Sequence, residues 1–315
     1  MTRRTAAFVW AVAALFVAVA AWPALAERLH FQAVAPGVFV HAGHVEMATE
    51  ENLGDIANIG FVIGGEGVAV IDTGGSMAVG RELLAAIRAE TDLPILYVIN
   101  THMHPDHTLG NGAFRGTGPD GGDPVFVGHA KMARSLAGRA SHYLQAGVEE
   151  IGQALVDEIE IVLPDESVDD QRRLDLGDRP LVLQAWSTAH TDNDMTVLDE
   201  ATGTLFAGDL LFMSHLPVVD GSIAGWITLH DRLREIPAER VVPGHGPASA
   251  PWPESLIPQE TYLKTLAKDV RQAIQSGVPM GRAVAEAAPP TGDWELVDEF
   301  HKRNVTAAFA ELEWE

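Results

Sequence analysis

The chain has 315 residues, of which 44 are acidic and 21 basic, and it contains no cysteine. Its formal net charge of −23 repels nucleic acid and anionic lipid, so neither is an expected partner. Without cysteine, the chain has no disulfide, no thiolate nucleophile, no lipid-modified cysteine and no cysteine metal ligand.

The first 26 residues have the pattern of an export signal. Arg3 and Arg4 precede a long uncharged apolar stretch, which ends in the A-x-A cleavage pattern Ala24-Leu25-Ala26. We therefore predict a signal peptide over 1–26, one folded domain over 27–315, a periplasmic location and no stable membrane association after cleavage. An uncleaved membrane anchor is the alternative, because the apolar stretch is nearly long enough to cross a bilayer. The arginine pair leaves both general and twin-arginine export open.

Strands are predicted at the start of the folded part. Between residues 31 and 71, short apolar runs alternate with glycines, which predicts a strand, a long connection over 43–57 and a β-hairpin. Asp72 follows the hairpin, and Ser76 is placed to cap a helix. The apolar side chains of this helix share one face and are Val79, Leu83, Leu84 and Ile87.

The hexapeptide His102-Met103-His104-Pro105-Asp106-His107 carries the clearest chemical signal. It begins where a buried strand predicted over 95–101 ends. Four side chains that can bind a metal lie within six residues, and burying them without a compensating ion would be costly. The hexapeptide therefore predicts a metal site, and a solvated histidine-rich turn is the alternative.

The second half of the chain repeats the alternation of helical and β-rich segments. A glycine-rich segment leads to a short strand over 125–127 and a helical region from about 130 to 155. His129 and His142 have no partner at ligand-like spacing, so we expect them to be solvated or locally bonded. Further predicted elements are a β-rich part over 181–209, a helix over 226–236, a strand at 241–242 and two C-terminal helices to which we assign no chemistry.

Three further potential ligands stand where predicted strands end. Together with the hexapeptide they provide enough ligands for two divalent ions, and imidazoles with carboxylates favour zinc, manganese or iron over calcium. The full set is His102, His104, Asp106, His107, His190, Asp209 and His245.

These motifs resemble the metallo-β-lactamase superfamily. The matching pieces are Val70-Ile71-Asp72-Thr73-Gly74, the His-x-His-x-Asp-His stretch, His190 with Asp194, Gly208-Asp209, and Pro243-Gly244-His245-Gly246. The resemblance implies an α/β fold, the four-layer αββα sandwich, with the 43–57 connection beside the metal site as a flap; a plain surface loop is the alternative. Residues 52–60 and the exported start are similar to the quinoprotein relay system zinc metallohydrolases. That subgroup is tied to periplasmic dehydrogenase or sulfur-oxidation systems, which implies a quinoprotein system as a partner.

The resemblance also implies a role for each ligand. It assigns His102, His104 and His190 to a first ion, and Asp106, His107 and His245 to a second, with Asp209 bridging the two. Two zinc ions are expected, with iron or manganese as alternatives.

Two aspartates receive additional roles. Asp106 is the catalytic residue expected to orient the attacking hydroxide or to pass its proton. Asp72 is expected to accept a hydrogen bond from a metal-bound imidazole, and a turn-forming aspartate is the alternative.

Three functions fit such a site. The first is a hydrolase that cleaves an ester, thioester, lactone or amide-type bond of a small molecule with a metal-bridging hydroxide. The others are an iron-dependent sulfur or oxygen oxidoreductase and a non-enzymatic metal-binding maturation factor for a quinoprotein. Hydrolysis of β-lactams is expected to be poor, because residues 210–230 should border the pocket and contain no lysine or arginine to anchor a carboxylate. In this stretch His215 is expected either to contact substrate or merely to lie near the metals.

Overall fold

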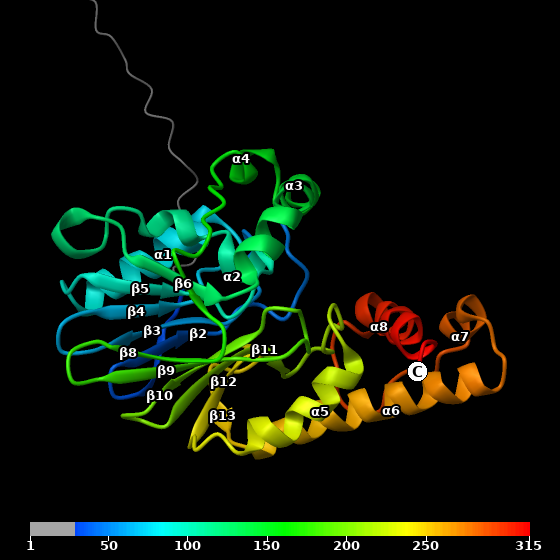
Figure 1. Ribbon diagram of the computed structural model, residues 1–315. Helices are drawn as coiled ribbons and strands as arrows, with labels where there is room; N and C mark the ends of the chain where they lie inside the picture. The colour runs from blue at the N-terminus through cyan, green and yellow to red at the C-terminus, as the bar shows by residue number, and fades with distance from the viewer. Residues whose placement is uncertain (1–28) are drawn as a thin grey trace, which may run out of the picture.

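The computed structural model describes residues 29–315, which form two β-sheets packed face to face (Figure 1). The first sheet has the strand order β1-β2-β3-β4-β5-β6-β7. Neighbours are antiparallel from β1 to β4 and parallel from β4 to β7. The strands are β1 (Gln32–Ala35), β2 (Val38–His41), β3 (Ile59–Ile63), β4 (Val68–Ile71), β5 (Ile95–Ile99), β6 (Val125–His129) and β7 (Glu166–Val168).

The second sheet has the order β13-β12-β11-β10-β9-β8. Only the β11–β12 pair is parallel among its neighbours in the described residues. β10 and β11 form a hairpin within the β-rich part predicted over 181–209. The strands are β8 (Gln171–Asp175), β9 (Pro180–Ala185), β10 (Met195–Asp199), β11 (Thr204–Phe212), β12 (Arg240–His245) and β13 (Ala250–Pro251).

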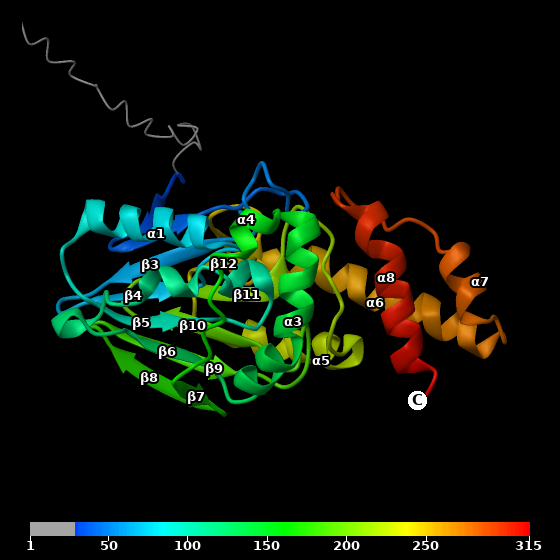
Figure 2. The same cartoon turned by 90° about the horizontal axis from the view of Figure 1, so that it is seen from above.

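Helices cover the outer faces of both sheets (Figures 1 and 2). α1 packs on the first sheet, α5 and α6 pack on the second, and α8 packs against α6. The four layers confirm the predicted αββα sandwich. The helices are α1 (Met77–Glu90), α2 (Pro105–Thr108), α3 (Met132–Glu150), α4 (Gln153–Val156), α5 (Ile223–Arg234), α6 (Ile257–Gln275), α7 (Met280–Ala285) and α8 (Val297–Leu312), with 3-10 turns η1 (Asn111–Phe114), η2 (Pro119–Gly121) and η3 (Glu254–Leu256).

The innermost core lies between the two sheets. Side chains such as Val62 and Ile99 from the first sheet meet Leu183, Val197 and Phe206 from the second, and all five are buried. Burial of a side chain of this size contributes roughly 1.5–3 kcal/mol. The two sheets are thereby fixed against each other, and so are the loops at their edges.

Helix α1 forms as its sequence predicts. Oγ of Ser76 accepts a hydrogen bond from the backbone N–H of Val79 at 3.3 Å, which caps the first turn. Val79, Leu83 and Ile87 are buried against the first sheet, and Leu84 is partly buried beside them. Capping and a single apolar face explain this helix locally.

Some predicted boundaries are displaced. The helical region expected over 130–155 is interrupted at Gly152, whose φ of +87° separates α3 from α4. The helix expected over 226–236 begins at Ile223, because Ser222 Oγ accepts from the Gly225 N–H at 2.9 Å. Strand β8 was not predicted, because Leu174 is the only buried side chain of this edge strand and no alternating pattern marks it.

The predicted signal peptide, residues 1–26, lies outside the described residues. Within residues 29–315, every helix is too short or too polar to cross a membrane.

Candidate metal centre

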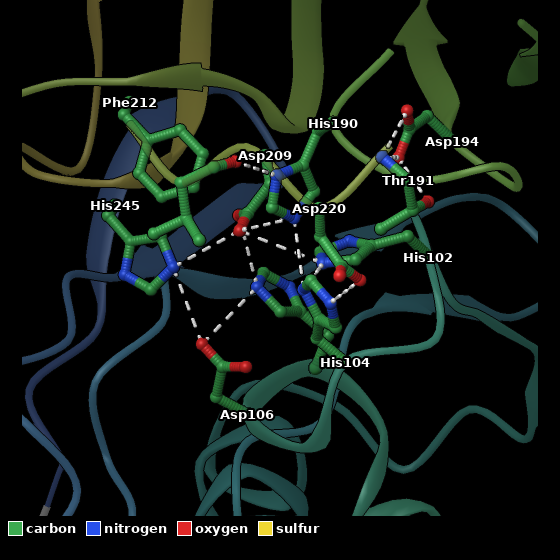
Figure 3. A network of polar contacts seen from close by, with 12 residues as sticks. His102, His104, Asp106, His190, Thr191, Asp194, Asp209, Phe212, Asp220 and His245 are labelled. Carbon is green, nitrogen blue, oxygen red and sulfur yellow. Dashed lines mark hydrogen bonds and ion pairs between the residues drawn. The ribbon is translucent and has the colours of Figure 1, made fainter. Parts of the chain in front are cut away.

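The predicted ligands converge at one edge of the sandwich, where strands of both sheets end (Figure 3). His102 follows β5, Asp209 lies within β11, and His245 is the last residue of β12. His190 lies in the connection between β9 and β10. The two-sheet packing thus brings together residues that are up to 143 positions apart, counting from 102 to 245.

The first cluster consists of three imidazoles and one carboxylate. Nδ1 of His104 lies 3.1 Å from Nε2 of His102 and 3.0 Å from Nε2 of His190. Oδ2 of Asp209 lies 3.6 Å from the His102 nitrogen and 3.3 Å from the His190 nitrogen. Four ligand atoms converging within 4.8 Å of one another suit a single divalent ion.

The second cluster comprises Asp106, His107 and His245. Nε2 of His245 lies 3.3 Å from Oδ2 of Asp106 and 3.4 Å from Oδ2 of Asp209. Nε2 of His107 lies 3.1 Å from Oδ1 of Asp209. Asp209 therefore lies between the clusters and faces both with its two oxygens, the arrangement expected of a bridging carboxylate (Figure 3).

Each of the five imidazoles has an acceptor for its outward-facing nitrogen. The pairs are His102 Nδ1 with Thr101 Oγ1 (3.1 Å), His104 Nε2 with Asp220 Oδ2 (3.2 Å), His107 Nδ1 with Asp72 Oδ2 (2.8 Å), His190 Nδ1 with the Val218 carbonyl (2.7 Å) and His245 Nδ1 with the Ile56 carbonyl (2.8 Å). An N–H on the outer nitrogen leaves a lone pair on the inner one, which is the form that binds a metal.

Asp72 lies within hydrogen-bond distance of the His107 imidazole, as its expected role as an acceptor requires. Besides the His107 bond, its carboxylate accepts from the Thr101 N–H at 2.8 Å and from Thr101 Oγ1 at 2.7 Å. Asp72 has a φ of +55°, an uncommon conformation for a residue other than glycine. This conformation lets one carboxylate hold both the start of the metal loop and one of its imidazoles.

Two buried polar atoms show that the residues fit a metal. Nε2 of His107 and Oδ1 of Asp209 make no hydrogen bond within residues 29–315. Buried polar groups are almost always paired, and an ion between these two atoms would satisfy both. Nitrogen and carboxylate ligands are those that zinc, manganese or iron accept.

The histidine pKa values differ between the two clusters. Burial lowers the pKa of His190 to about 4 and that of His102 well below its usual value, so these two imidazoles are neutral. Burial also opposes the charge of His245, yet the carboxylates of Asp209 and Asp106 raise the pKa of this imidazole to about 9. The second cluster thus attracts positive charge, which a divalent ion supplies.

Two glycines make room for the bridging carboxylate. A Cβ at Gly244 would lie 1.9 Å from Oδ1 of Asp209, and one at Gly208 would meet the Thr101 side chain at 2.6 Å. Gly208 also has a φ of +51°. The glycines next to Asp209 and His245 are therefore required by close approach of the strands.

A family model described as the metallo-beta-lactamase superfamily matches residues 53–245, more than half of the chain. The chain belongs to the metallo-β-lactamase superfamily. Its two His/Asp clusters lie within the matched part of the chain.

Solved structures of several superfamily members share the fold. A double mutant of the sec-alkyl sulfatase PisA1 superposes with a TM-score of 0.70 at 16% identity, over 90% of this chain and 50% of that one. A beta-lactamase domain protein from Burkholderia ambifaria gives 0.65 at 18% identity, over 90% and 88% of the chains. The mono-zinc form of the metallo-beta-lactamase FIM-1 from Pseudomonas aeruginosa gives 0.58 at 21% identity, over 75% and 95%.

One sequence relative is also an alkylsulfatase. The linear primary-alkylsulfatase of a Pseudomonas species is 45% identical over 49 residues, which are 16% of this chain and 9% of that protein. The chain therefore matches only a small part of that relative and spans half of the sec-alkyl sulfatase structure.

A pocket with a volume of about 310 Å³ opens over both clusters of this superfamily member. The 43–57 connection contributes Glu46, Met47, Ala48, Gly54 and Ile56 to its wall, which is the flap position that the resemblance predicts. The flap is held at the metal centre, because the Ile56 carbonyl accepts from His245.

Several residues that line or support the pocket were not predicted from the sequence. Asp220 holds His104 and also accepts from Arg139 Nη1 at 2.6 Å. Arg139 and Tyr143 lie four residues apart in α3, so one face of this helix borders the pocket. No local motif marks these three residues, since their positions depend on how α3 and the loop before α5 pack.

Two other histidines have different surroundings. His142 is exposed, as expected, and also lines the pocket. His129 is buried and is bonded to the Lys131 N–H nearby in the chain and to the distant Trp186 carbonyl. No chemistry was expected of the C-terminal helices, yet Phe300 and Arg303 of α8 line the pocket.

His215 lines the pocket as a neutral side chain, as expected, whereas cations come from elements outside residues 210–230. Burial lowers the pKa of His215 to about 3, so this pocket residue is neutral, and burial lowers that of His230 to about 4. Residues 210–230 contribute no cation, yet Arg139 and Arg303 come from distant helices. The pocket as a whole therefore has guanidinium groups that residues 210–230 lack.

Proposed function

We propose that the protein is an exported dinuclear zinc hydrolase that cleaves an ester, thioester, lactone or amide-type bond of a small molecule. The observation that carries the proposal is Asp209, whose two oxygens face two ligand clusters at the base of one pocket. Two divalent ions held there would lower the pKa of a water molecule and polarise the scissile group.

The chain's own residues supply orientation and proton transfer. Asp106 borders the pocket with an 18% exposed side chain, and its Oδ2 lies 3.3 Å from His245. This carboxylate is placed to orient the attacking water and to accept its proton. Thr101, Asp72, Asp220 and two backbone carbonyls hold the five imidazoles, so the ligands need little rearrangement when they bind metal.

The lining of the pocket favours a substrate with an apolar part. Met47 and Ile56 of the flap, Leu109, and Leu296 and Phe300 near α8 all contribute to the wall. Arg303, which also lines the pocket, can meet an acidic or polar group. The local match to a linear primary-alkylsulfatase adds sulfate esters to the bonds worth testing.

An activity panel on zinc-loaded protein tests this function. The substrates are p-nitrophenyl butyrate, a butyryl thioester, a γ-lactone, an anilide, p-nitrophenyl sulfate and benzylpenicillin. We expect at least one of the first five to be turned over with kcat/KM above about 10⁴ M⁻¹s⁻¹. Asp106→Asn should lower this value by about 100-fold or more. Asp231→Asn is the matched control, because the Asp231 side chain is 89% exposed and lies in α5 outside the pocket.

Metal content separates this function from its rivals. Two zinc ions without turnover of any panel substrate would contradict the hydrolase. Iron in the native preparation, together with oxygen consumption, would favour the iron-dependent oxidoreductase.

The periplasmic location and the quinoprotein partner are proposals that rest on the sequence. The signal-like residues 1–26 support export, and residues 52–60 support the quinoprotein relay subgroup. Osmotic shock of a Gram-negative host should release a chain that begins at Glu27. Mass spectrometry of an intact residue 1–26 segment in the membrane fraction would contradict cleavage.

A further inference from the structure

Tyr143 brings an unpaired phenol to the edge of the metal pocket. The residue is only 8% exposed, and its Oη has no hydrogen-bond partner within residues 29–315. A buried hydroxyl without a partner destabilises a fold, so few are found in native proteins. Tyr143 lines the same pocket as Asp106 and His104, and a molecule bound there can supply the missing partner.

The ring of Tyr143 is held in place by apolar contacts. It belongs to a buried cluster with Met103, Met132 and Leu136. Met103 stands between His102 and His104, so the loop that carries the metal ligands also packs against this ring. The phenol therefore has a fixed position relative to the first ligand cluster.

The neighbours of the hydroxyl leave its proton available. Burial raises the pKa of Tyr143 to about 12, so the phenol keeps its proton at neutral pH. The charge of Arg139 opposes this effect of burial, whereas the Asp220 and Asp106 carboxylates add to it. A guanidinium has only donors and cannot accept the phenol proton, and Asp220 already accepts from Arg139 and His104.

We propose that Tyr143 is a catalytic residue that donates a hydrogen bond from Oη to an oxygen of the scissile group. The inference rests on the proposed hydrolase function and adds the protein group that stabilises charge on the substrate. A carbonyl, sulfuryl or phosphoryl oxygen gains negative charge as water attacks, and a preorganised donor stabilises that charge. The donor is held in place because its ring is packed in a buried apolar cluster.

The test compares Tyr143→Phe with Tyr262→Phe in the zinc-loaded full chain. Both substitutions remove one buried hydroxyl, but Oη of Tyr262 is bonded to Asn304 and His301 away from the metal pocket. Three quantities are measured: kcat/KM on the best panel substrate, the affinity for inorganic phosphate by calorimetry, and Tm. Phosphate is used because its tetrahedral oxygens resemble those of the transition state.

We expect Tyr143→Phe to lower kcat/KM by about 100-fold, in line with loss of one donor to a developing negative charge. The same variant should weaken phosphate binding by about tenfold, keep two zinc ions and leave Tm unchanged or higher. Tyr262→Phe should lower Tm and leave kcat/KM and phosphate affinity unchanged. This opposite pattern separates a catalytic donor from a structural hydroxyl.

Two results would overturn the inference. One is a Tyr143→Phe protein with unchanged phosphate affinity and a lowered Tm, which would mean that the hydroxyl is structural. The other is wild-type protein that does not bind phosphate at the metal centre. The phosphate titration needs no turnover. It therefore tests the hydrogen bond from Tyr143 even if no panel substrate is hydrolysed and the proposed function is wrong.

Discussion

Asp220 Oδ2 accepts a hydrogen bond from Nε2 of His104 at 3.2 Å, although 116 residues separate the two in the chain. The same oxygen accepts from Arg139 Nη1 at 2.6 Å. Burial would raise the pKa of the Asp220 carboxyl, but His104 and Arg139 outweigh it and lower this pKa to about 2. The carboxylate is therefore ionised at neutral pH. The ionised carboxylate fixes the His104 tautomer that points Nδ1 at the first ligand cluster.

Removing Asp220 should therefore weaken the first metal site. Asp220→Ala should reduce zinc affinity there by about 10–100-fold, the usual effect of losing an outer hydrogen-bond partner. Competition with a zinc-binding dye measures the change. Arg139→Met is the informative companion, because it leaves the His104 bond intact and should have a smaller effect. Equal affinity in wild type and Asp220→Ala would show that the carboxylate does not orient His104.

The number of bound ions is the second prediction. The mature protein should hold about two transition-metal ions, since the seven ligands form two clusters. His245→Ala should leave about one ion, and Asp209→Ala should reduce the total most, because its oxygens face both clusters. Elemental analysis after dialysis provides the count. A single ion in wild type that persists in His245→Ala would mean that the second site does not form.

His41, at the base of the flap, should stabilise the fold to an extent that depends on pH. Both ring nitrogens of His41 face oxygens: Nε2 lies 2.9 Å from Asp55 Oδ2, and Nδ1 lies 3.1 Å from the His30 carbonyl. Burial opposes protonation, but the Asp55 hydrogen bond and charge outweigh it, so the pKa of His41 is raised above 6.5. Because the folded-state pKa is the higher one, the stabilisation is fully present below about 6.5 and is lost as pH rises through the raised value.

Thermal unfolding of wild type and His41→Gln checks this sign. The Tm of wild type should exceed that of the variant most at pH 5.5, and the gap should narrow by pH 9 by a few degrees. Asp55→Asn should show the same narrowing, since it removes the other partner. A gap that widens with pH would mean that neutral His41 is the form that stabilises the fold.

Hydrolysis of β-lactams should be poor for a reason that differs in part from the sequence argument. Residues 210–230 offer no cation for the drug's carboxylate, and Arg139 is already paired with Asp220. Glu46 and Glu150 line the same pocket as Arg303 and repel an anion. Zinc-loaded protein should turn over penicillins, cephalosporins and carbapenems with a kcat/KM far below that of its best substrate in the panel.

Arg303 is the pocket residue that could bind the carboxylate of a β-lactam. A β-lactam turned over at about 10⁶ M⁻¹s⁻¹, the range of an evolved substrate, would contradict it. A large loss of that activity in Arg303→Ala would then identify Arg303 as the carboxylate anchor that residues 210–230 do not provide.

The sequence alone predicted the candidate ligand set and determined the fold class. Metal ligands occur in short motifs because a loop at a strand end must present them at fixed spacing, so His102 to His107, His190, Asp209 and His245 are recognisable locally. Helix α1 was also predictable, because its capping residue Ser76 and its apolar face lie within one short segment of the chain. The matched motifs also run in the order of the superfamily, which indicated the αββα sandwich.

Only the tertiary structure decided which groups surround the metals. Asp220, Arg139, Tyr143 and Arg303 come from a loop and two helices that meet at the pocket through packing, and an isolated aspartate, arginine or tyrosine carries no spacing signal. The same holds for His142, which lies on the pocket face of α3, and for His129, which is bonded away from the pocket. Sequence patterns report which side chains one element buries, whereas the relative placement of elements depends on contacts between residues far apart in the chain.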